Sequence, residues 1–532
     1  MKKTKGIVNS NNLYRSFSTL PFHWLLFAIF PILFFYSNNI KELSLDVLVA
    51  PIFYTIVIAT IIYLVLTFLL KNLHKAAAVS SLFFVLFFSF GHVKTFFHAQ
   101  DRFLLLIWLI FLITGLYLLL KTSRNLVRLT NLLNIASVFL VVFSLANISY
   151  FEIANGRIFK FSENNPSNTQ NTLAKLKKPE NAPDIYYFIF DRYASFGTLK
   201  DLYNYKDISE FESYLTKKGF YIPTYGYANY PRTFLSLASS LNMGYVNYLT
   251  GQLGENSGDE ATAYKLLKNY KVQALLKSVG YKYIHVGSWW EPTRQNDSAD
   301  KNFFYSPFRF RGLSLDEFST KLIETTLASE FLSRTSVQGT IEPLYGRTNH
   351  RESILFQFKT LEEEVIPSKG PKFVFAHLLV PHPPYVLDEN CTLITEQDTE
   401  KRKESDNYLN QLACTNKKIK TLINKIQTES KGSAIIILQA DEGPEGVKNK
   451  LSQKWQESSI DAIREKTGIL NAYYLPGKSK NDLYPSITPV NTFRKIFNLY
   501  FGANFDILED KVYVVESKEH PYKMFDVTEK LR

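Results

Sequence analysis

The first 150 residues contain five long apolar stretches separated by short polar loops. The stretches lie at residues 17–37, 47–70, 76–93, 103–120 and 131–149. Each approaches or exceeds the length of about 18 to 20 residues that crosses the hydrocarbon core of a bilayer. No small-residue cleavage site follows the first stretch, so we interpret it as an anchor and not as a signal peptide. The pattern predicts a domain of five transmembrane helices over residues 1–150.

The polar loops between these stretches differ in their content of basic residues. The N-terminus and alternate loops hold nine, and the other loops hold three. The nine are Lys2, Lys3, Lys5, Arg15, Lys71, Lys75, Lys121, Arg124 and Arg128, and the three are Lys41, Lys94 and Arg102. Because loops rich in Lys and Arg stay in the cytoplasm, we expect an integral membrane protein with a cytoplasmic N-terminus. Five crossings then place the large C-terminal part outside, on the periplasmic or extracellular face.

The rest of the chain changes in pattern twice. Residues 151–183 are rich in Asn, Ser, Lys and Pro and read as a linker. From residue 184 to 532 short apolar runs alternate with longer amphipathic stretches, which indicates an α/β domain with a mostly parallel central sheet. The runs expected to form buried strands lie at 185–190, 281–287, 372–380, 433–440 and 471–476. The predicted fold class is α/β, with a five-helix transmembrane bundle before the extracytoplasmic domain.

Composition and charge narrow the possible partners. With 46% hydrophobic and 21% charged residues, the chain is folded and not disordered or collagen-like. Residues 1–150 supply nine of the twelve excess positive charges, and the remainder carries 49 basic against 46 acidic side chains. No nucleic-acid partner is therefore expected. Cys391 and Cys414 are the only cysteines. They could form one bridge in an extracytoplasmic domain, although two thiols are equally compatible.

Polar residues follow three of the predicted strands. Asp191 follows the first, His382 the third, and Asp441 and Glu442 the fourth. Ligand sites in open α/β sheets lie at the carboxyl ends of strands, so we expect these side chains to converge. Carboxylates from separate strands suit a divalent cation. Taken singly, an Asp after a strand is more often a turn or cap residue.

A candidate nucleophile lies in the segment NYPRTFLSLASSLNM (229–243). Pro231 breaks the preceding segment, and an apolar helix is predicted to begin near Thr233. The free N–H groups and the positive dipole end of a helix stabilise an anion there. Arg232 beside it could clamp an oxyanion. The alternative is that Thr233 only caps the helix, because Thr is a favoured cap residue.

Four segments together resemble the alkaline phosphatase and sulfatase superfamily. They are PDIYYFIFDRYAS (183–195), NYPRTFLSLASSLNM (229–243), FAHLLVPHPPYV (375–386) and LQADEGPEG (438–446). The resemblance is to the membrane-bound branch, which includes lipoteichoic acid synthases and phosphoethanolamine transferases. It implies that Asp191 and Asp441 are metal ligands and that Thr233 is the metal-bound nucleophile. His382 resembles the histidine that holds the transferred group or assists the leaving group. His377 is a weaker candidate for that task, with a buried strand histidine as the alternative.

One position departs from the family pattern. The last motif commonly reads Asp-His-Gly, and here it reads Asp441-Glu442-Gly443. If Glu442 binds the metal, the oxygen-only set of Asp191, Thr233, Asp441 and Glu442 favours one Mn²⁺, Mg²⁺ or Ca²⁺ ion over Zn²⁺. Alternatively the substitution impairs the site.

The resemblance predicts a membrane-anchored, metal-dependent hydrolase or transferase acting on a phosphoryl-type or sulfuryl ester of an envelope lipid or glycan. The Cys or Ser followed by x-Pro-x-Arg of sulfatases is absent, so ordinary sulfate-ester hydrolysis is disfavoured. A Thr nucleophile fits a two-step transfer through a covalent intermediate. The alternative is a catalytically silent binding or assembly protein of the envelope. Nothing in the sequence indicates the oligomeric state.

The segment HVGSWWEPTR (285–294) is a further candidate. Trp289 and Trp290 could stack on a sugar or headgroup, and Arg294 could clamp an anion. The alternative, which we favour, is that the paired Trp residues cover an edge of the core. His285 likewise could belong to a ligand site or to the core.

Overall fold

The computed structural model describes residues 20–97, 101–155, 157, 176–306, 309–310, 313–314, 316–330 and 347–531. The chain divides into two compact units. The first comprises Met1–Phe161 together with Leu315–Tyr345, and the second comprises Ser162–Ser314 and Gly346–Arg532. We describe each unit by itself.

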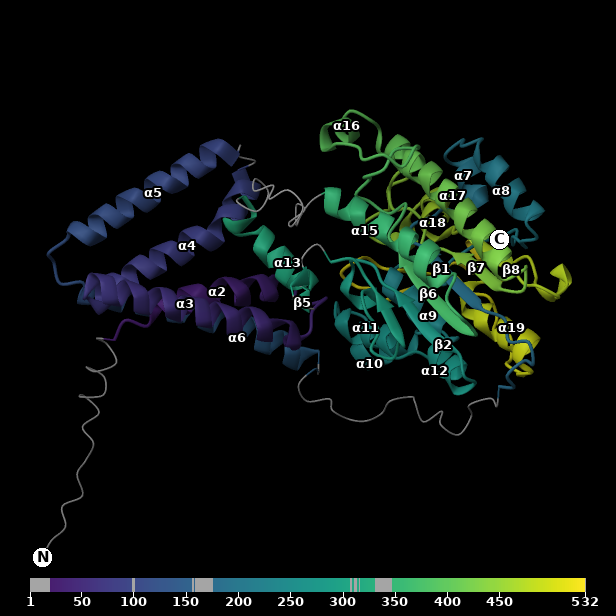
Figure 1. Ribbon diagram of the computed structural model, residues 1–532, viewed down its shortest axis with the longest axis horizontal. Coiled ribbons are helices and arrows are strands. Elements are labelled where there is room, and N and C mark those ends of the chain that lie inside the picture. The colour runs from purple at the N-terminus through teal and green to yellow at the C-terminus, as the bar shows by residue number, and fades with distance from the viewer. Residues whose placement is uncertain are drawn as a thin grey trace, which may run out of the picture. The chain divides into compact units, whose positions relative to one another are not determined.

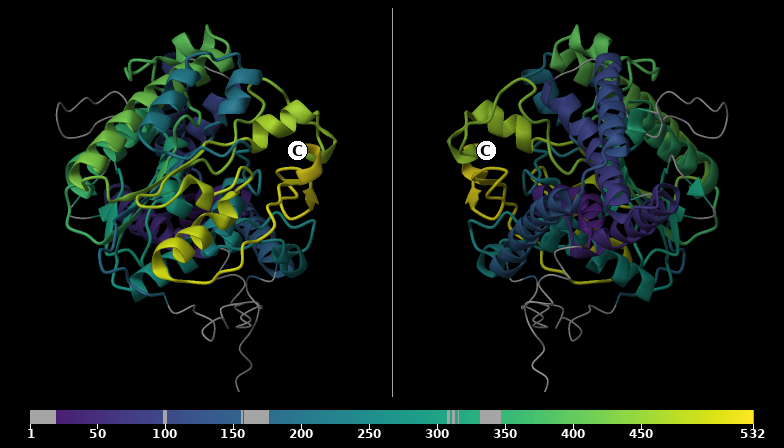
Figure 2. Two further views of the ribbon diagram at one scale, coloured as in Figure 1. Left: turned by 90° about the vertical axis from the view of Figure 1, so that its right-hand side faces the viewer. Right: turned by 90° about the vertical axis from the view of Figure 1, so that its left-hand side faces the viewer.

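Five apolar helices form the first unit, coloured purple to blue in Figure 1 and in the right-hand view of Figure 2. They are α2 (His23–Asn38), α3 (Val49–Leu70), α4 (Leu73–Phe97), α5 (Asp101–Lys121) and α6 (Val127–Ala154). Within the described residues, four are long and apolar enough to cross a membrane, and α2 is shorter, with 16 residues. The expected class is confirmed, with the difference that only four of the five spans have full length. The surfaces of α3 and α5 carry many exposed Leu, Ile and Phe side chains, as expected of helices that face lipid.

A tertiary contact holds the beginning of α2. The Asn134 side chain of α6 accepts hydrogen bonds from the backbone N–H groups of Phe22 and His23, at 3.3 and 3.0 Å. The His23 ring in turn pairs with the Ser81 hydroxyl of α4 at 2.6 Å. These contacts satisfy N–H groups that have no partner within the helix, and they tie α2, α4 and α6 together by polar interactions that are suited to a membrane interior.

The segment after residue 315 leaves the second unit and packs in the first. Helix α13 (Glu317–Glu324) buries Phe318 and Leu322 in a cluster with residues of α2 and α6. The Gly91 N–H of α4 donates to the Thr325 carbonyl at 3.0 Å. A Cβ atom at Gly91 would lie 2.6 Å from that oxygen, so only glycine permits this approach. The sequence pattern did not predict that this segment belongs with the membrane helices.

A six-stranded sheet forms the centre of the second unit (Figure 1). Its strand order is β3-β2-β6-β1-β7-β8, and every pairing is parallel except that of β7 with β8. The strands are β1 (Ile185–Phe190), β2 (Lys282–Val286), β3 (Lys301–Phe303), β6 (Lys372–Leu378), β7 (Ile435–Gln439) and β8 (Asn471–Tyr474). The five runs predicted from the sequence all form strands of this sheet. The mostly parallel sheet is therefore confirmed. Small antiparallel pairs join β4 (Arg309–Phe310) to β5 (Leu313–Ser314) and β9 (Tyr513–Val515) to β10 (Met524–Asp526).

Helices cover both faces of the sheet. On one face α7 (Phe196–Asp201), α8 (Ile208–Lys217), α15 (Arg347–Thr360) and α17 (Glu404–Glu429) pack on the even-numbered residues of β1. On the other face α9 (Thr233–Asn242), α11 (Ala261–Lys268), α12 (Lys271–Ser278) and α19 (Pro489–Phe501) pack on its odd-numbered residues. This alternation follows from the two-residue period of a strand. The other α-helices described in this unit are α10 (Tyr248–Leu253), α16 (Glu396–Glu400), α18 (Ile460–Thr467) and α20 (Thr528–Leu531).

Candidate metal centre

Three adjacent strands bring the candidate ligands together. β1 lies between β6 and β7, so the residues at the carboxyl ends of these strands are neighbours. Ile189 is in register with His377 on one side and with Gln439 on the other. Asp191 follows β1 directly, and its N–H donates to the Leu378 carbonyl of β6 at 2.9 Å. The parallel register therefore places Asp191 and His377 at the same edge, with Asp441 just beyond the end of β7.

Asp191, His377 and Asp441 form a buried group of possible metal ligands. One ligand atom from each lies within 4.8 Å of the others, and Nε2 of His377 is 3.6 Å from Oδ2 of Asp191. Among the described residues, Oδ1 of Asp191, both carboxylate oxygens of Asp441 and Nε2 of His377 are buried without a hydrogen-bond partner. Leaving four polar atoms unpaired in the interior is costly. A divalent cation would satisfy all of them, so the residues fit a metal ion.

The His377 ring is held by its other nitrogen. Nδ1 lies 2.8 Å from the Thr293 hydroxyl, and that hydroxyl also pairs with Ser288 at 2.9 Å. The Trp290 ring packs edge-on against the imidazole, with centroids 5.9 Å apart. These contacts leave Nε2 aimed at Asp191. Histidine ligands of metals are commonly oriented by such a partner on the second ring nitrogen.

The two carboxylates of the group differ in their proton affinity. Burial, with Asp191 and Glu442 close by, raises the pKa of Asp441 well above its usual range, and the Thr233 side chain acts in the opposite direction. Burial opposes ionisation of Asp191 as well, but His382, His377 and Arg192 outweigh it and hold the pKa of this carboxyl below its usual range. Without a metal Asp191 thus ionises more readily than Asp441, as expected of two carboxylates in close contact.

Thr233 lies at the beginning of α9, where its sequence position predicted it. Its side chain is close enough to affect the pKa of Asp441, although the two make no hydrogen bond in the described geometry. Arg232, the preceding residue, pairs with Glu260 at 2.5 Å and lies over the Phe234 ring, 5.5 Å from its centroid. The first turn of α9, which begins at Thr233, therefore lies near Asp441.

His382 lies on the loop after β6 and is half-buried. Its Nδ1 pairs with the carbonyl of Pro383, and its own carbonyl accepts a hydrogen bond from Gln411 of α17 at 2.9 Å. Burial lowers the pKa of His382, and the nearby Asp191 carboxylate partly offsets this effect. The disulfide between Cys391 and Cys414 ties the end of the same loop to α17. Of the two alternatives left open by the sequence, the structure thus has the bridge.

Glu442 is not a member of the group of three candidate ligands and is engaged in ion pairs. Its carboxylate pairs with Lys466 at 2.8 Å and with Arg192 at 3.2 Å. The following residue, Gly443, comes so close to α18 that a Cβ atom would lie 2.1 Å from the Glu465 carbonyl. His377, an interior residue of β6, is a candidate nitrogen ligand that joins Asp191 and Asp441 in the group. The preference for Mn²⁺, Mg²⁺ or Ca²⁺ rested on the oxygen-only set of Asp191, Thr233, Asp441 and Glu442, and the ligand set stays a prediction.

The segment 285–294 contributes through a residue that the sequence analysis did not single out. Thr293 contacts His377, whereas His285 is a core residue whose ring nitrogens pair with the Tyr283 hydroxyl at 2.8 Å and the Thr293 carbonyl at 2.7 Å. Burial lowers the pKa of His285 to about 4. Arg294 is buried against the Phe304 ring, with its guanidinium carbon 5.0 Å from the ring centroid. No motif would have identified Thr293, because its role depends on the packing of two distant segments.

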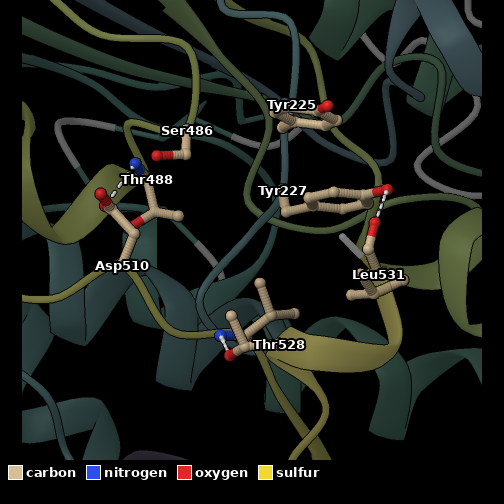
Figure 3. Close-up of a pocket in the computed structure, with 8 residues that line it drawn as sticks. Tyr225, Tyr227, Ser486, Thr488, Asp510, Thr528 and Leu531 are labelled. Carbon is tan, nitrogen blue, oxygen red and sulfur yellow. Dashed lines mark hydrogen bonds between the residues drawn. The ribbon is translucent and has the colours of Figure 1, made fainter.

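A small pocket lies elsewhere in the second unit (Figure 3). Tyr225, Tyr227 and Asp510 are among its lining residues. The Asp510 carboxylate accepts a hydrogen bond from the backbone N–H of Thr488 at 2.8 Å. None of the candidate ligands lines this pocket, so it is separate from the metal centre.

Fold and site together define a membrane-anchored α/β protein with a candidate metal centre at the edge of a parallel sheet. The family model for sulfatases matches residues 192–493, more than half of the chain. The chain therefore belongs to the sulfatase family, and the resemblance stated from its motifs is confirmed. No curated protein matches the sequence.

Many solved structures are similar to this chain, two of them as follows. The C-terminal periplasmic domain of EcEptC from Escherichia coli has 14% identity and a TM-score of 0.41, covering 66% of this chain and 95% of that one. The integral membrane lipooligosaccharide phosphoethanolamine transferase A from Neisseria meningitidis has 10% identity and a TM-score of 0.39, covering 92% of this chain and 94% of that one.

Proposed function

We propose that this protein is a metal-dependent enzyme that transfers or hydrolyses a phosphoryl-type ester of a membrane lipid or lipid-linked glycan, with Thr233 as the nucleophile. The observation that carries the proposal is the buried, unpartnered group of Asp191, His377 and Asp441 beside the N-terminus of α9. Sulfatase-family membership supports the same class of ester chemistry. A sulfuryl ester is the second possible substrate class.

Asp191, His377 and Asp441 would hold one divalent ion, with the Thr233 hydroxyl beside it. An imidazole nitrogen with two carboxylates suits Mn²⁺ or Zn²⁺ better than Mg²⁺ or Ca²⁺, which prefer oxygen ligands. When bound, such an ion lowers the pKa of a hydroxyl and neutralises the charge of the phosphoryl oxygens.

Side chains of the protein carry out the remaining chemistry. In the first step the Thr233 oxygen forms a bond to phosphorus while the bond to the leaving oxygen breaks, and one proton passes from Thr233 to the leaving oxygen. We assign this proton transfer to Nε2 of His382, because its Nδ1 is engaged with the Pro383 carbonyl. In the second step water or an acceptor alcohol attacks phosphorus, and the bond from phosphorus to the Thr233 oxygen breaks. The proton of the attacking group passes through His382 to the Thr233 oxygen. Arg232, at the start of α9, is proposed to stabilise the developing negative charge.

We further propose that the second unit lies outside the cytoplasm and the N-terminus inside. The distribution of basic residues favours this orientation, and the Cys391–Cys414 disulfide supports an oxidising compartment. Four helices of membrane-spanning length support an integral membrane protein. A single anchor would be enough to hold a catalytic domain at the membrane. The presence of several spans is therefore consistent with a substrate that is embedded in the membrane.

The test uses the full-length protein purified in detergent. We expect about one equivalent of Mn²⁺ or Zn²⁺ by elemental analysis, and hydrolysis of a phosphodiester model substrate. The Thr233→Ala variant should retain the metal and lose turnover, and Thr233→Ser should keep part of the activity. Mass spectrometry of the quenched reaction should detect the transferred group on the peptide that contains Thr233. A protein that binds no metal would refute the proposal and favour the silent binding protein, which could have lost activity through Glu442.

A further inference from the structure

Arg192, directly after the ligand Asp191, has an unusual backbone conformation. Its φ angle is +61°, in the left-handed region that non-glycine residues rarely adopt. The Tyr408 hydroxyl holds this turn, because it donates to the Arg192 carbonyl at 3.0 Å and accepts from the Ala194 N–H at 3.0 Å. Such conformations persist only when the surroundings impose them, and they are concentrated at functional sites. The fold therefore fixes where the Arg192 side chain points.

The guanidinium of Arg192 belongs to a cluster of charges beside the metal centre. Glu442 pairs with its Nε at 3.2 Å, and Glu445 lies 3.7 Å from its Nη2. Lys466 pairs with the same two carboxylates at 2.8 and 3.0 Å, and Lys518 pairs with Glu445. Three cations therefore face the carboxylates of Glu442 and Glu445.

Exposure distinguishes Arg192 from Lys466. The Lys466 side chain is 1% exposed, so this residue already neutralises Glu442 in the interior, whereas the Arg192 side chain is 20% exposed. Burial acts against the charge of Arg192, but Glu442, Asp191 and Glu445 outweigh it and raise the pKa of the guanidinium. Arg192 also lies close enough to His382 to affect its charge. The side chain thus belongs to the ion-pair cluster and is also near Asp191 and His382, to which the proposed chemistry assigns metal binding and proton transfer.

We propose that Arg192 binds the anionic oxygens of the transferred group, and that Glu442 is a positioning residue that holds the guanidinium in place. This inference rests on the proposed function and gives the departure of Glu442 from the family pattern a role. A guanidinium held along one edge by a carboxylate keeps donors on its other edge for an anion. The ligand chemistry is that of phosphate, whether as a free ion or as part of an ester.

The test measures binding of inorganic phosphate to the full-length, Mn²⁺-loaded protein by isothermal titration calorimetry. Arg192→Gln should weaken phosphate binding about 10- to 100-fold, as expected for loss of a charge-assisted hydrogen bond, and Arg192→Lys should restore part of it. Glu442→Gln should weaken it less and leave the Mn²⁺ stoichiometry unchanged. Arg464→Gln, which removes an exposed arginine beside Tyr227, is the matched control.

The outcomes separate this inference from the proposed function. Unchanged phosphate affinity in a folded, Mn²⁺-loaded Arg192→Gln variant would overturn the role of Arg192 and leave the metalloenzyme proposal standing. Loss of Mn²⁺ in Glu442→Gln would make Glu442 a ligand and overturn its positioning role. A wild-type protein that binds neither Mn²⁺ nor Zn²⁺ would refute both. The melting temperature of each variant identifies misfolding. If Arg192→Gln misfolds, the phosphate affinity of the Arg192→Lys protein decides whether Arg192 binds the anion.

Discussion

The hydroxyl of Thr293 lies 2.8 Å from Nδ1 of His377, although 84 residues separate them in the chain. This contact fixes the imidazole so that Nε2 faces Asp191. We expect Thr293→Val, which keeps the shape and removes the hydroxyl, to lower metal affinity about 10-fold. Mn²⁺ titration of the chelator-treated protein measures the effect. Unchanged affinity would mean that packing against Trp290 alone orients the ring.

His377 and Glu442 make opposite predictions for metal binding. His377→Asn should abolish tight binding of a divalent ion, because it removes the only nitrogen of the three-ligand group. Glu442→Gln should keep the ion, because Glu442 is engaged with Lys466 and Arg192. Elemental analysis of the two purified variants decides. The reverse result would restore the ligand assignment expected from the family motif.

Metal binding should depend on pH through Asp441. In the folded, metal-free protein the pKa of this carboxyl is raised. Above about pH 4 the folded protein therefore keeps a proton that the unfolded chain has lost. The free energy of unfolding of the metal-free protein should therefore fall as the pH rises above that value. The total fall is about 1.4 kcal/mol for each unit by which folding raises the pKa of Asp441. Chemical denaturation in the presence of a chelator at several pH values measures this slope.

Two further results follow from the same proton. Binding of Mn²⁺ should release it, and the affinity should increase with pH, since the ligand must be ionised. Calorimetry in buffers of different ionisation enthalpy counts the released protons. Asp441→Asn should flatten the pH dependence of stability and bind no metal. If it keeps the wild-type slope, another group is responsible.

The disulfide should stabilise the loop that carries His382. It closes a separation of 23 residues between Cys391 and Cys414, and loss of such a bridge costs about 3 kcal/mol. The double variant Cys391→Ala/Cys414→Ala should melt at a lower temperature and be cleaved more readily between residues 381 and 395. Reduction of the wild-type protein should have the same effect, and treatment of the double variant with reductant should have none.

Gly91 should be required for docking of the segment 316–330. A Cβ atom there would meet the Thr325 backbone at 2.6 Å, so Gly91→Ala should push this segment off α4 at a cost of about 1 to 3 kcal/mol. Increased protease cleavage at residues 316–330 measures the displacement. Gly251→Ala is the control, because a Cβ atom there has no neighbour within 4 Å. Equal cleavage in both variants would contradict the prediction.

Local pattern predicted much of the fold. The apolar stretches located the five apolar helices α2 to α6 of the first unit but not α13, and the short apolar runs located β1, β2, β6, β7 and β8. These features repeat over many residues, so one sequence is enough to reveal them. The length of α2 was less well predicted, because its beginning is fixed by Asn134 of a different helix.

The candidate site, like the fold, was predicted from local pattern only in part. The sequence by itself determined that Asp191 and Asp441 follow buried strands and that Thr233 begins a helix, because each depends on its immediate neighbours. Only the tertiary structure decided that His377 joins the two carboxylates while Glu442 turns to Lys466 and Arg192. The physical reason is that ligand choice depends on strand order and register, which place residues from three separate strands within a few ångströms, and no local pattern records those distances.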